Sequence, residues 1–191
     1  MPGPQTEAND LILQASREID GRNRRERLYQ AVEYVWTNFR YDNWLNDQMF
    51  QRTVVRMFED GILGGCSDFA LVMVALFRTV GIPARLVLTA NTDWLEKYRA
   101  NPLAIINGHV FIEVFLEHRW HLVDPTYRKL FVGYEIATPF YPRGELFCLR
   151  GVDYWSLGLE NVEQLNSTYA RITASLIPER YRDPNYVAHE L

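Results

Sequence analysis

Apolar side chains recur along this chain with two different periods, which separate predicted helices from predicted strands. Over residues 25–39 they return every three or four positions, which places one apolar stripe on a helix. Over residues 69–77 every position is apolar, and Gly81 and Pro83 follow as a stop signal. A helix that is apolar on all sides is expected at the centre of a domain, and this nine-residue run is too short to span a membrane.

The remaining pattern predicts more helices and several short strands. Helical spacing is found over residues 49–59 and again from residue 156 to about 176. Strand-like runs occupy residues 85–89, 110–116, 120–123 and 146–149. The segment Glu117-His118-Arg119 between two of these runs predicts a hairpin. The order predicts an α+β fold in which the central apolar helix packs on an antiparallel sheet.

The chain is expected to form one domain. It has 191 residues, of which 48% are hydrophobic, and this excludes an intrinsically disordered chain. We expect the domain to span residues 9–176 with its core motifs at 61–127. Residues 1–8 read as a frayed end and residues 177–191 as a tail.

Charge and cysteine content narrow the function classes. A net charge of −4 provides no positive field for nucleic acid, so neither nucleic-acid nor membrane binding is expected. The first residues lack the basic and apolar segments of a signal peptide, which favours a cytoplasmic protein, although secretion as an effector is compatible with the sequence. Two cysteines make no disulfide framework. His118, His121 and Asp124 alternate between strand faces or lie in the turn, so we expect no metal and no cofactor.

A candidate nucleophile opens the central helix. Cys66 follows Gly64 and Gly65, and the positive end of a helix favours a thiolate over a thiol. Gly65 and its neighbour allow a tight turn and the close approach of a substrate carbonyl. The backbone N–H of Cys66 is a natural oxyanion donor. On position alone, a buried structural cysteine is an equal alternative.

A candidate base and acid lie at the two ends of the predicted hairpin. His109 opens its first strand and Asp124 closes its second, so both reach one edge of the sheet. If the turn centres on His118, Asp124 faces about Ile112, which leaves an offset of about 10 Å along the strand. A β-bulge or strong twist would then be needed to bring the two side chains together.

The two strings GGCSDFALVMVALFRTVGIPAR and GHVFIEVFLEHRWHLVDPTY carry several spaced signals. A cysteine opens a helix that ends in GIPAR, a histidine opens a strand, and a tryptophan is followed shortly by Asp-Pro. This pattern resembles the core of the transglutaminase-like superfamily, whose fold is papain-like. The resemblance implies that Cys66 is the nucleophile, His109 the base and Asp124 the orienting acid. Val110 departs from the Trp that many members carry after the histidine.

The resemblance implies cysteine-dependent acyl chemistry on amide bonds, through a thioester on Cys66 and without a cofactor. Water would resolve the thioester in a protease, deamidase or amidase, and an amine would resolve it in a transglutaminase. The lack of calcium-loop spacing favours hydrolysis. An inactive binding module of the same fold is a further alternative, which the intact Cys-His-Asp set opposes. A peptide or protein substrate is expected, and the oligomeric state stays open.

Further residues are candidates for substrate contact. Related enzymes take a second oxyanion donor from upstream, where the candidates are Trp44, Tyr41 and Gln48. The long connection over residues 91–107 leads directly to His109, which favours a lid over the site. Trp94, together with Leu95 and Tyr98, is expected to face inward, while Glu96, Lys97 and Arg99 stay solvated.

Overall fold

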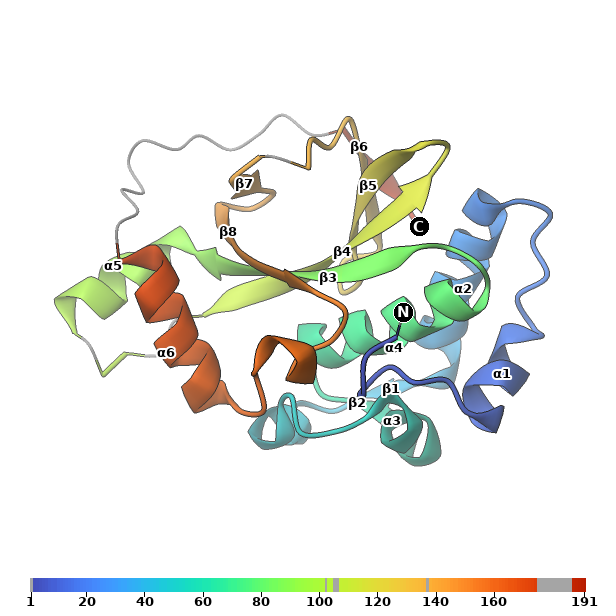
Figure 1. Ribbon diagram of the computed structural model, residues 1–191, viewed down its shortest axis with the longest axis horizontal. Helices are drawn as coiled ribbons and strands as arrows, with labels where there is room; N and C mark the ends of the chain where they lie inside the picture. Colours follow the sequence, from blue (N-terminus) through green and yellow to red (C-terminus); the bar gives the residue numbers. More distant parts are fainter. Residues whose placement is uncertain (1, 102, 105–106, 137, 175–186) are drawn as a thin grey trace.

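The computed structural model describes residues 2–101, 103–104, 107–136, 138–174 and 187–191. Figure 1 shows an antiparallel sheet with helices α1 to α4 on one side and with α5 and α6 at one end. The helices are α1 (Asp10–Ser16), α2 (Arg24–Asn38), α3 (Val54–Asp60), α4 (Cys66–Thr79), α5 (Thr92–Ala100) and α6 (Val162–Thr173), with the 3-10 helices η1 (Asn43–Gln48) and η2 (Trp155–Leu157). The α+β prediction is therefore confirmed.

Among the described residues, the main sheet has seven strands in the order β7-β8-β3-β4-β5-β6-β9, and all neighbours are antiparallel. These are β3 (Ala84–Asn91), β4 (Gly108–Leu116), β5 (Arg119–Asp124), β6 (Lys129–Val132), β7 (Phe140–Tyr141), β8 (Glu145–Gly151) and β9 (Val187–Glu190). A separate parallel pair joins β1 (Arg40–Tyr41) to β2 (Ile62–Leu63). The four strands predicted from the sequence correspond to β3, β4, β5 and β8.

The central position of α4 is confirmed. Every residue from 67 to 77 in this helix is buried. Helices α1, α2 and α3 and strands β3 and β4 all contact it. An all-round apolar helix is stable only in such surroundings, because no side of it tolerates water. Its N-terminus, where Cys66 lies, is thereby fixed by the whole core.

Two predicted helices begin later than the pattern indicates. The helix expected from residue 49 begins at Val54, because Phe50 has a left-handed φ of 69° and Thr53 caps the helix by accepting a bond from Arg56 N. The helix expected from residue 156 begins at Val162, because Gly158 adopts φ 73° and Asn161 forms the cap. The expected end of this helix near residue 176 lies outside the described residues.

The N-terminal segment packs against the body of the protein. Gln5 is 1% exposed and Thr6 is 2% exposed, which differs from the frayed end that the sequence suggested for residues 1–8. Near the other end, β9 pairs with β6 within the segment expected to be a tail. Residues 177–186 of that expected tail are not among those described.

The register of the β4–β5 hairpin shortens the predicted offset between His109 and Asp124 by one residue. Its turn consists of two residues, Glu117 (φ 50°) and His118 (φ 65°), as in a type I′ turn. The pairing of Ile112 with Val123 places Asp124 opposite Phe111, one position nearer to His109 than expected. The offset is therefore two residues, which keeps both side chains on one face of the sheet, and the ladder needs no bulge here.

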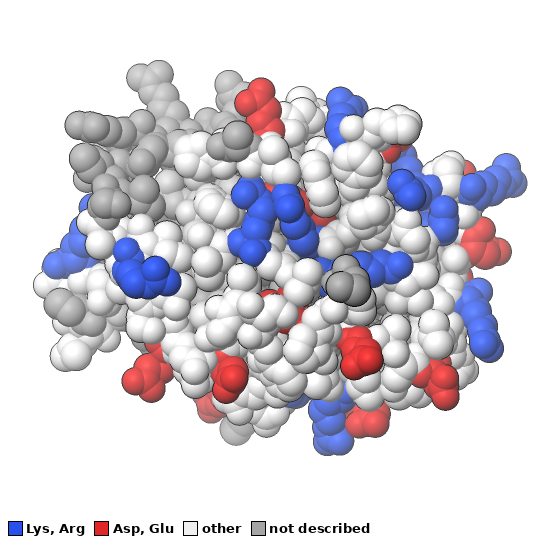
Figure 2. Space-filling model, viewed as in Figure 1, with Lys and Arg blue, Asp and Glu red and all other residues white. Residues whose placement is uncertain are grey.

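Charged residues do not form a field of one sign on the face shown in Figure 2, where basic and acidic side chains both occur. Arg85 donates to the buried Glu113 with an Nε–Oε2 distance of 2.5 Å. Arg150 donates to the same carboxylate at 2.7 Å. Within the described ranges, no helix combines the length and the apolar composition that a membrane span requires.

Candidate functional site

The loop before Cys66 is held by a buried carboxylate. Asp68 Oδ2 accepts a hydrogen bond from Gly64 N at 2.8 Å and forms an ion pair with Arg52. Burial raises the pKa of Asp68, although the charge of Arg52 and the Gly64 N–H act in the opposite direction. A Cβ at Gly64 would lie 2.7 Å from Leu45 Cβ, so the close approach of η1 requires glycine there. The turn that presents Cys66 is thus fixed from two sides.

The position of His109 is also set by a glycine. A Cβ on Gly108 would lie 1.8 Å from Thr89 O, so the close approach of β3 requires glycine there. His109 is 7% exposed, and its Nε2 lies 2.9 Å from Asp124 Oδ1. The ring packs edge-on against Phe111 with centroids 4.7 Å apart. Because Nε2 faces Asp124, the other ring nitrogen, Nδ1, is the one left for a thiol.

Cys66 and Asp124 together favour a positive charge on His109. Burial alone disfavours the charged ring, but hydrogen bonds to Asp124 and Cys66 and their negative charges outweigh it and raise the pKa of His109 to about 10. These contacts therefore favour the protonated form of the ring. The structure thus brings Cys66, His109 and Asp124 into contact, and their catalytic roles stay a prediction.

Asp124 is anchored by the turn that follows it. Its Oδ1 accepts hydrogen bonds from Thr126 N and Tyr127 N, both at 3.1 Å, and its side chain is 1% exposed. Such side chain-to-backbone bonds are typical of Asp before a turn. Arg143 Nη1 lies 3.9 Å from Asp124 Oδ2, and its guanidinium stacks over Tyr127 at 4.1 Å from the ring centroid. Sequence reasoning missed Arg143, which carries no motif.

A groove of about 890 Å³ opens at the thiol, and apolar surface makes up most of it. Its lining residues come from five parts of the chain: Asp47, Met49, Gln51, Gly65, Cys66, Trp94, Ala104, Asn107, Asn161, Val162 and Glu163. Two candidates for substrate contact, Gly65 and Trp94, therefore line it. Tyr41 and Gln48 are exposed and are not among its described lining residues. Trp44 lies in η1, and its side chain is outside what the structure describes.

Helix α5 carries both anchoring residues and a groove residue. Leu95 is 1% exposed and Tyr98 packs against the main core, so these two side chains fix the helix to the body. Trp94 faces the groove instead, with Lys97 Nζ 4.7 Å from its ring centroid. Glu96, Lys97 and Arg99 are exposed, as expected. The proposed lid motion of this segment stays a prediction.

Comparison with known proteins places this geometry in a family. The model of the transglutaminase-like superfamily matches residues 14–125, a range that includes Cys66, His109 and Asp124. The chain belongs to this superfamily. Comparison with curated proteins finds no match.

Two solved structures resemble this member of the superfamily. One is a candidate cysteine protease from Cytophaga hutchinsonii, with a TM-score of 0.59 and 19% identity over 83% of this chain and 47% of that protein. The other is a TGase, with a TM-score of 0.43 and 18% identity over 69% of this chain and 33% of that protein. The chain spans less than half the length of either protein. At this identity the first likeness shows the shared transglutaminase-like, papain-like fold.

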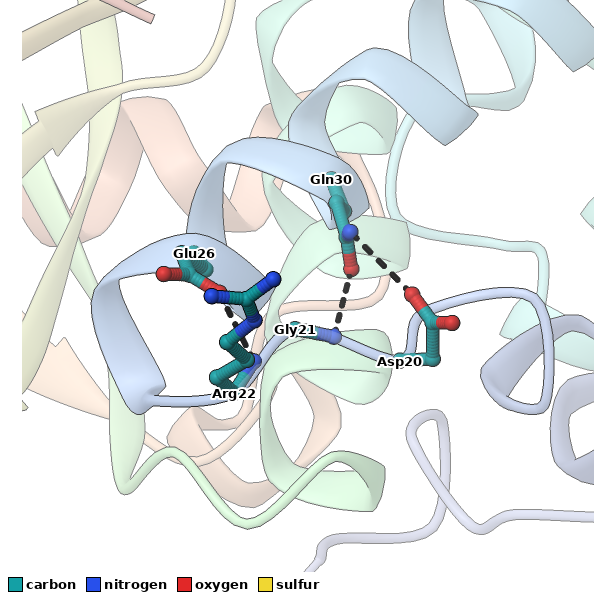
Figure 3. Close-up of a pocket in the computed structure, with 5 residues that line it drawn as sticks. All are labelled: Asp20, Gly21, Arg22, Glu26 and Gln30. Atoms are coloured by element: carbon teal, nitrogen blue, oxygen red, sulfur yellow. Dashed lines mark hydrogen bonds between the residues drawn. The ribbon is translucent and has the colours of Figure 1, made fainter.

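Three other features of the protein were considered as possible sites: a polar cavity, metal-binding clusters and the second cysteine. A cavity of about 520 Å³ lies where the loop of residues 20–22 meets α2. The polar groups that line it bond one another (Figure 3): Gly21 N donates to Gln30 Oε1 at 2.8 Å, and Arg22 N donates to Glu26 Oε2 at 2.8 Å. Within the part of the chain that is described, no group of three or more His, Cys, Asp or Glu residues suits a metal ion. Both cysteines are free, and burial raises the pKa of Cys148 to about 12.

Proposed function

We propose that the protein is a cysteine hydrolase that acts on amide bonds of peptides or proteins through a thioester on Cys66. The observation that carries the proposal is the connected set of Cys66, His109 and Asp124, with the thiol on the lining of an open groove. Family membership supports the same chemistry. Transamidation and an inactive binding module remain as distinct outcomes of the test.

The geometry supports a two-step acyl transfer. The Cys66 thiolate attacks the substrate carbonyl carbon, while the Cys66 N–H at the start of α4 stabilises the developing oxyanion. The His109 imidazolium donates its proton to the leaving nitrogen as the C–N bond breaks, which leaves a thioester and an amine. His109 then takes a proton from water, the resulting hydroxide attacks the thioester, and the C–S bond breaks. The acid product leaves, and the imidazolium–thiolate pair is restored.

The proposal can be tested with denatured casein as the substrate. Casein is incubated with the wild-type protein or with Cys66→Ala, each in the presence and absence of a primary amine. Hydrolysis predicts peptide cleavage or glutamine deamidation by the wild type alone, together with an acid-trapped thioester on Cys66 in the intact mass spectrum. Incorporation of the amine would assign transamidation instead. The binding-module alternative predicts no product and no thioester in either sample, and this outcome would overturn the proposal.

The alkaline limit of activity is expected to follow His109. Because the imidazolium must protonate the leaving group, kcat/KM should hold through neutral pH and fall as pH rises through the His109 pKa of about 10. Asp124→Asn keeps a hydrogen-bond acceptor for the ring but removes the charge, so the alkaline limb should move down by about 1–3 pH units. The pH profile of kcat/KM measures this shift. The exposed Asp10→Asn is the matched control, and an unmoved limb in Asp124→Asn would refute the assignment.

Trp94 is expected to contribute to substrate binding in the groove rather than to the stability of the core. Trp94→Ala should lower kcat/KM about tenfold, equivalent to about 1.4 kcal/mol, and change the unfolding free energy little. Leu95→Ala, one residue away and buried, should instead cost about 2–5 kcal/mol of stability. Steady-state kinetics and urea unfolding of both variants separate the two roles. Large destabilisation by Trp94→Ala, with unchanged kinetics of the folded fraction, would contradict the prediction.

A further inference from the structure

One wall of the catalytic groove contains a strained residue. Phe50 lies between Met49 and Gln51, which both line the groove, and it adopts a left-handed φ of 69°. For a bulky non-glycine residue this conformation costs free energy and persists only where surrounding contacts hold it. Phe50 is 3% exposed, and its ring packs against Tyr154 with centroids 4.5 Å apart. The contacts that hold Phe50 therefore also shape the groove.

The N-terminal segment supplies many of these contacts through Gln5. Gln5 Nε2 donates to Phe50 O at 2.9 Å and to Arg52 O at 3.1 Å. Gln5 O accepts from Val54 N at 2.9 Å, at the start of α3. Trp155 Nε1 donates to the same Phe50 carbonyl at 2.7 Å. The strained peptide thus has two donors from segments distant in sequence.

Gln5 binds the segment around η2 at the same time. Its Oε1 accepts from Tyr154 N at 3.0 Å and from Trp155 N at 3.1 Å, and its own N–H donates to Asp153 Oδ2 at 2.8 Å. The side chain is 1% exposed, so water does not compete for these bonds. Gln5 therefore joins the Phe50 loop to η2 as one unit. It is not among the residues that line the groove.

A second cavity lies where these two segments meet. It has a volume of about 560 Å³ and is lined by Gln51, Trp155, Glu160 and Asn161. Gln51 and Asn161 also line the catalytic groove, so the two spaces adjoin. Each is as large as an ordinary ligand pocket. An extended peptide, unlike a small amide, has the length to occupy both.

We propose that Gln5 is a positioning residue that fixes the boundary between the two cavities, so that an extended peptide acyl donor binds across both. This inference rests on the proposed function, because it assigns the peptide's reactive amide to Cys66. Gln5 acts only through the Phe50 loop and η2 and does not touch the substrate. Its loss should weaken the binding of long substrates and leave the reactivity of the thiol intact.

The test compares two synthetic peptides, one of four residues and one of twelve. Both contain the amide bond of casein on which the wild-type protein acts most rapidly. The wild type should process the longer peptide with a kcat/KM about tenfold or more higher, chiefly through KM. Gln5→Ala and Trp155→Phe each remove hydrogen bonds to the Phe50 carbonyl and should abolish most of that advantage, about five- to tenfold in KM for the long peptide. The second-order rate constant for alkylation of Cys66 by iodoacetamide should stay at the wild-type value.

Trp120→Phe is the matched control, because Trp120 in β5 packs against Arg85 in β3 and lines neither cavity. It should leave the length advantage unchanged. If Gln5→Ala does not fold, Trp155→Phe decides. Equal losses on both peptides, or no length advantage in the wild type, would overturn the inference. If no Cys66-dependent turnover is found, the proposed function fails, and a binding experiment then decides the inference. It compares the binding of denatured casein to Cys66→Ala and to the double variant that also carries Trp155→Phe. A rise of about tenfold in Kd for the double variant supports the inference, and an unchanged Kd overturns it.

Discussion

Replacement of Cys66 by alanine is expected to lower kcat/KM on any amide substrate by about 10⁴-fold or more, because it removes the thiol on which the proposed acyl intermediate forms. The fold should remain intact, since Cys66 lies at the end of α4 and is only partly buried. Cys66→Ser should be nearly as inactive, because a hydroxyl beside an imidazolium ionises far less readily than a thiol. Initial rates and circular dichroism measure both expectations.

Cys148 provides the matched control for this variant. It is 5% exposed, and burial raises its pKa to about 12, so the thiol has no access to substrate. Cys148→Ala should therefore retain catalysis in the folded protein, and iodoacetamide should modify Cys66 long before Cys148. Undiminished turnover by Cys66→Ala would rule out the thioester mechanism. Equal labelling of the two cysteines in the native protein would contradict the imidazolium-activated thiol.

The spaced motifs predicted which elements carry the candidate site residues, because each motif is local. A cysteine after two glycines opens the buried helix α4, and a histidine after a glycine opens β4. The error lay in the hairpin, where the turn was centred on His118. Glu117 and His118 both adopt positive φ without the Asn-Gly or Asp-Gly signal of such turns, so the sequence did not mark the true centre. One position of register decides whether His109 and Asp124 share a face of the sheet.

The groove was harder to predict, because its walls come from distant segments. Residues 47–51, α5 and the start of α6 meet at Cys66 only in the folded chain. Gln5 forms hydrogen bonds with Asp153, Tyr154 and Trp155, which are separated from it in sequence by 148, 149 and 150 positions. No local pattern at the N-terminus distinguishes such a buried glutamine from one in a frayed end. Phe50 likewise takes its left-handed conformation from tertiary bonds that override the helical spacing of residues 49–59. Long-range hydrogen bonds thus determine the conformations of Gln5 and Phe50, which the periodic pattern did not predict.

Asp68→Ala is expected to destabilise the protein by about 3–5 kcal/mol, because it leaves the guanidinium of Arg52 buried without its main partner. The two side chains are 4% and 6% exposed, and the only other carboxylate in ion-pair contact with Arg52, within the described ranges, is Asp60 at 3.6 Å. The same change orphans the Gly64 N–H beside Cys66. Urea unfolding measures the loss of stability, and the rate of Cys66 alkylation measures the displacement of the turn.

Asp68→Asn separates the charge from the hydrogen bond. Its side-chain oxygen can still accept from Gly64 N, so the turn and the reactivity of Cys66 should be largely preserved. Burial already raises the pKa of Asp68, which means that desolvation opposes much of the attraction to Arg52, and the asparagine should therefore cost less stability than the alanine. A loss below about 1 kcal/mol in Asp68→Ala would show that Arg52 finds solvent or Asp60 instead. In that case Asp68 would matter to the nucleophile's turn through the Gly64 N–H alone.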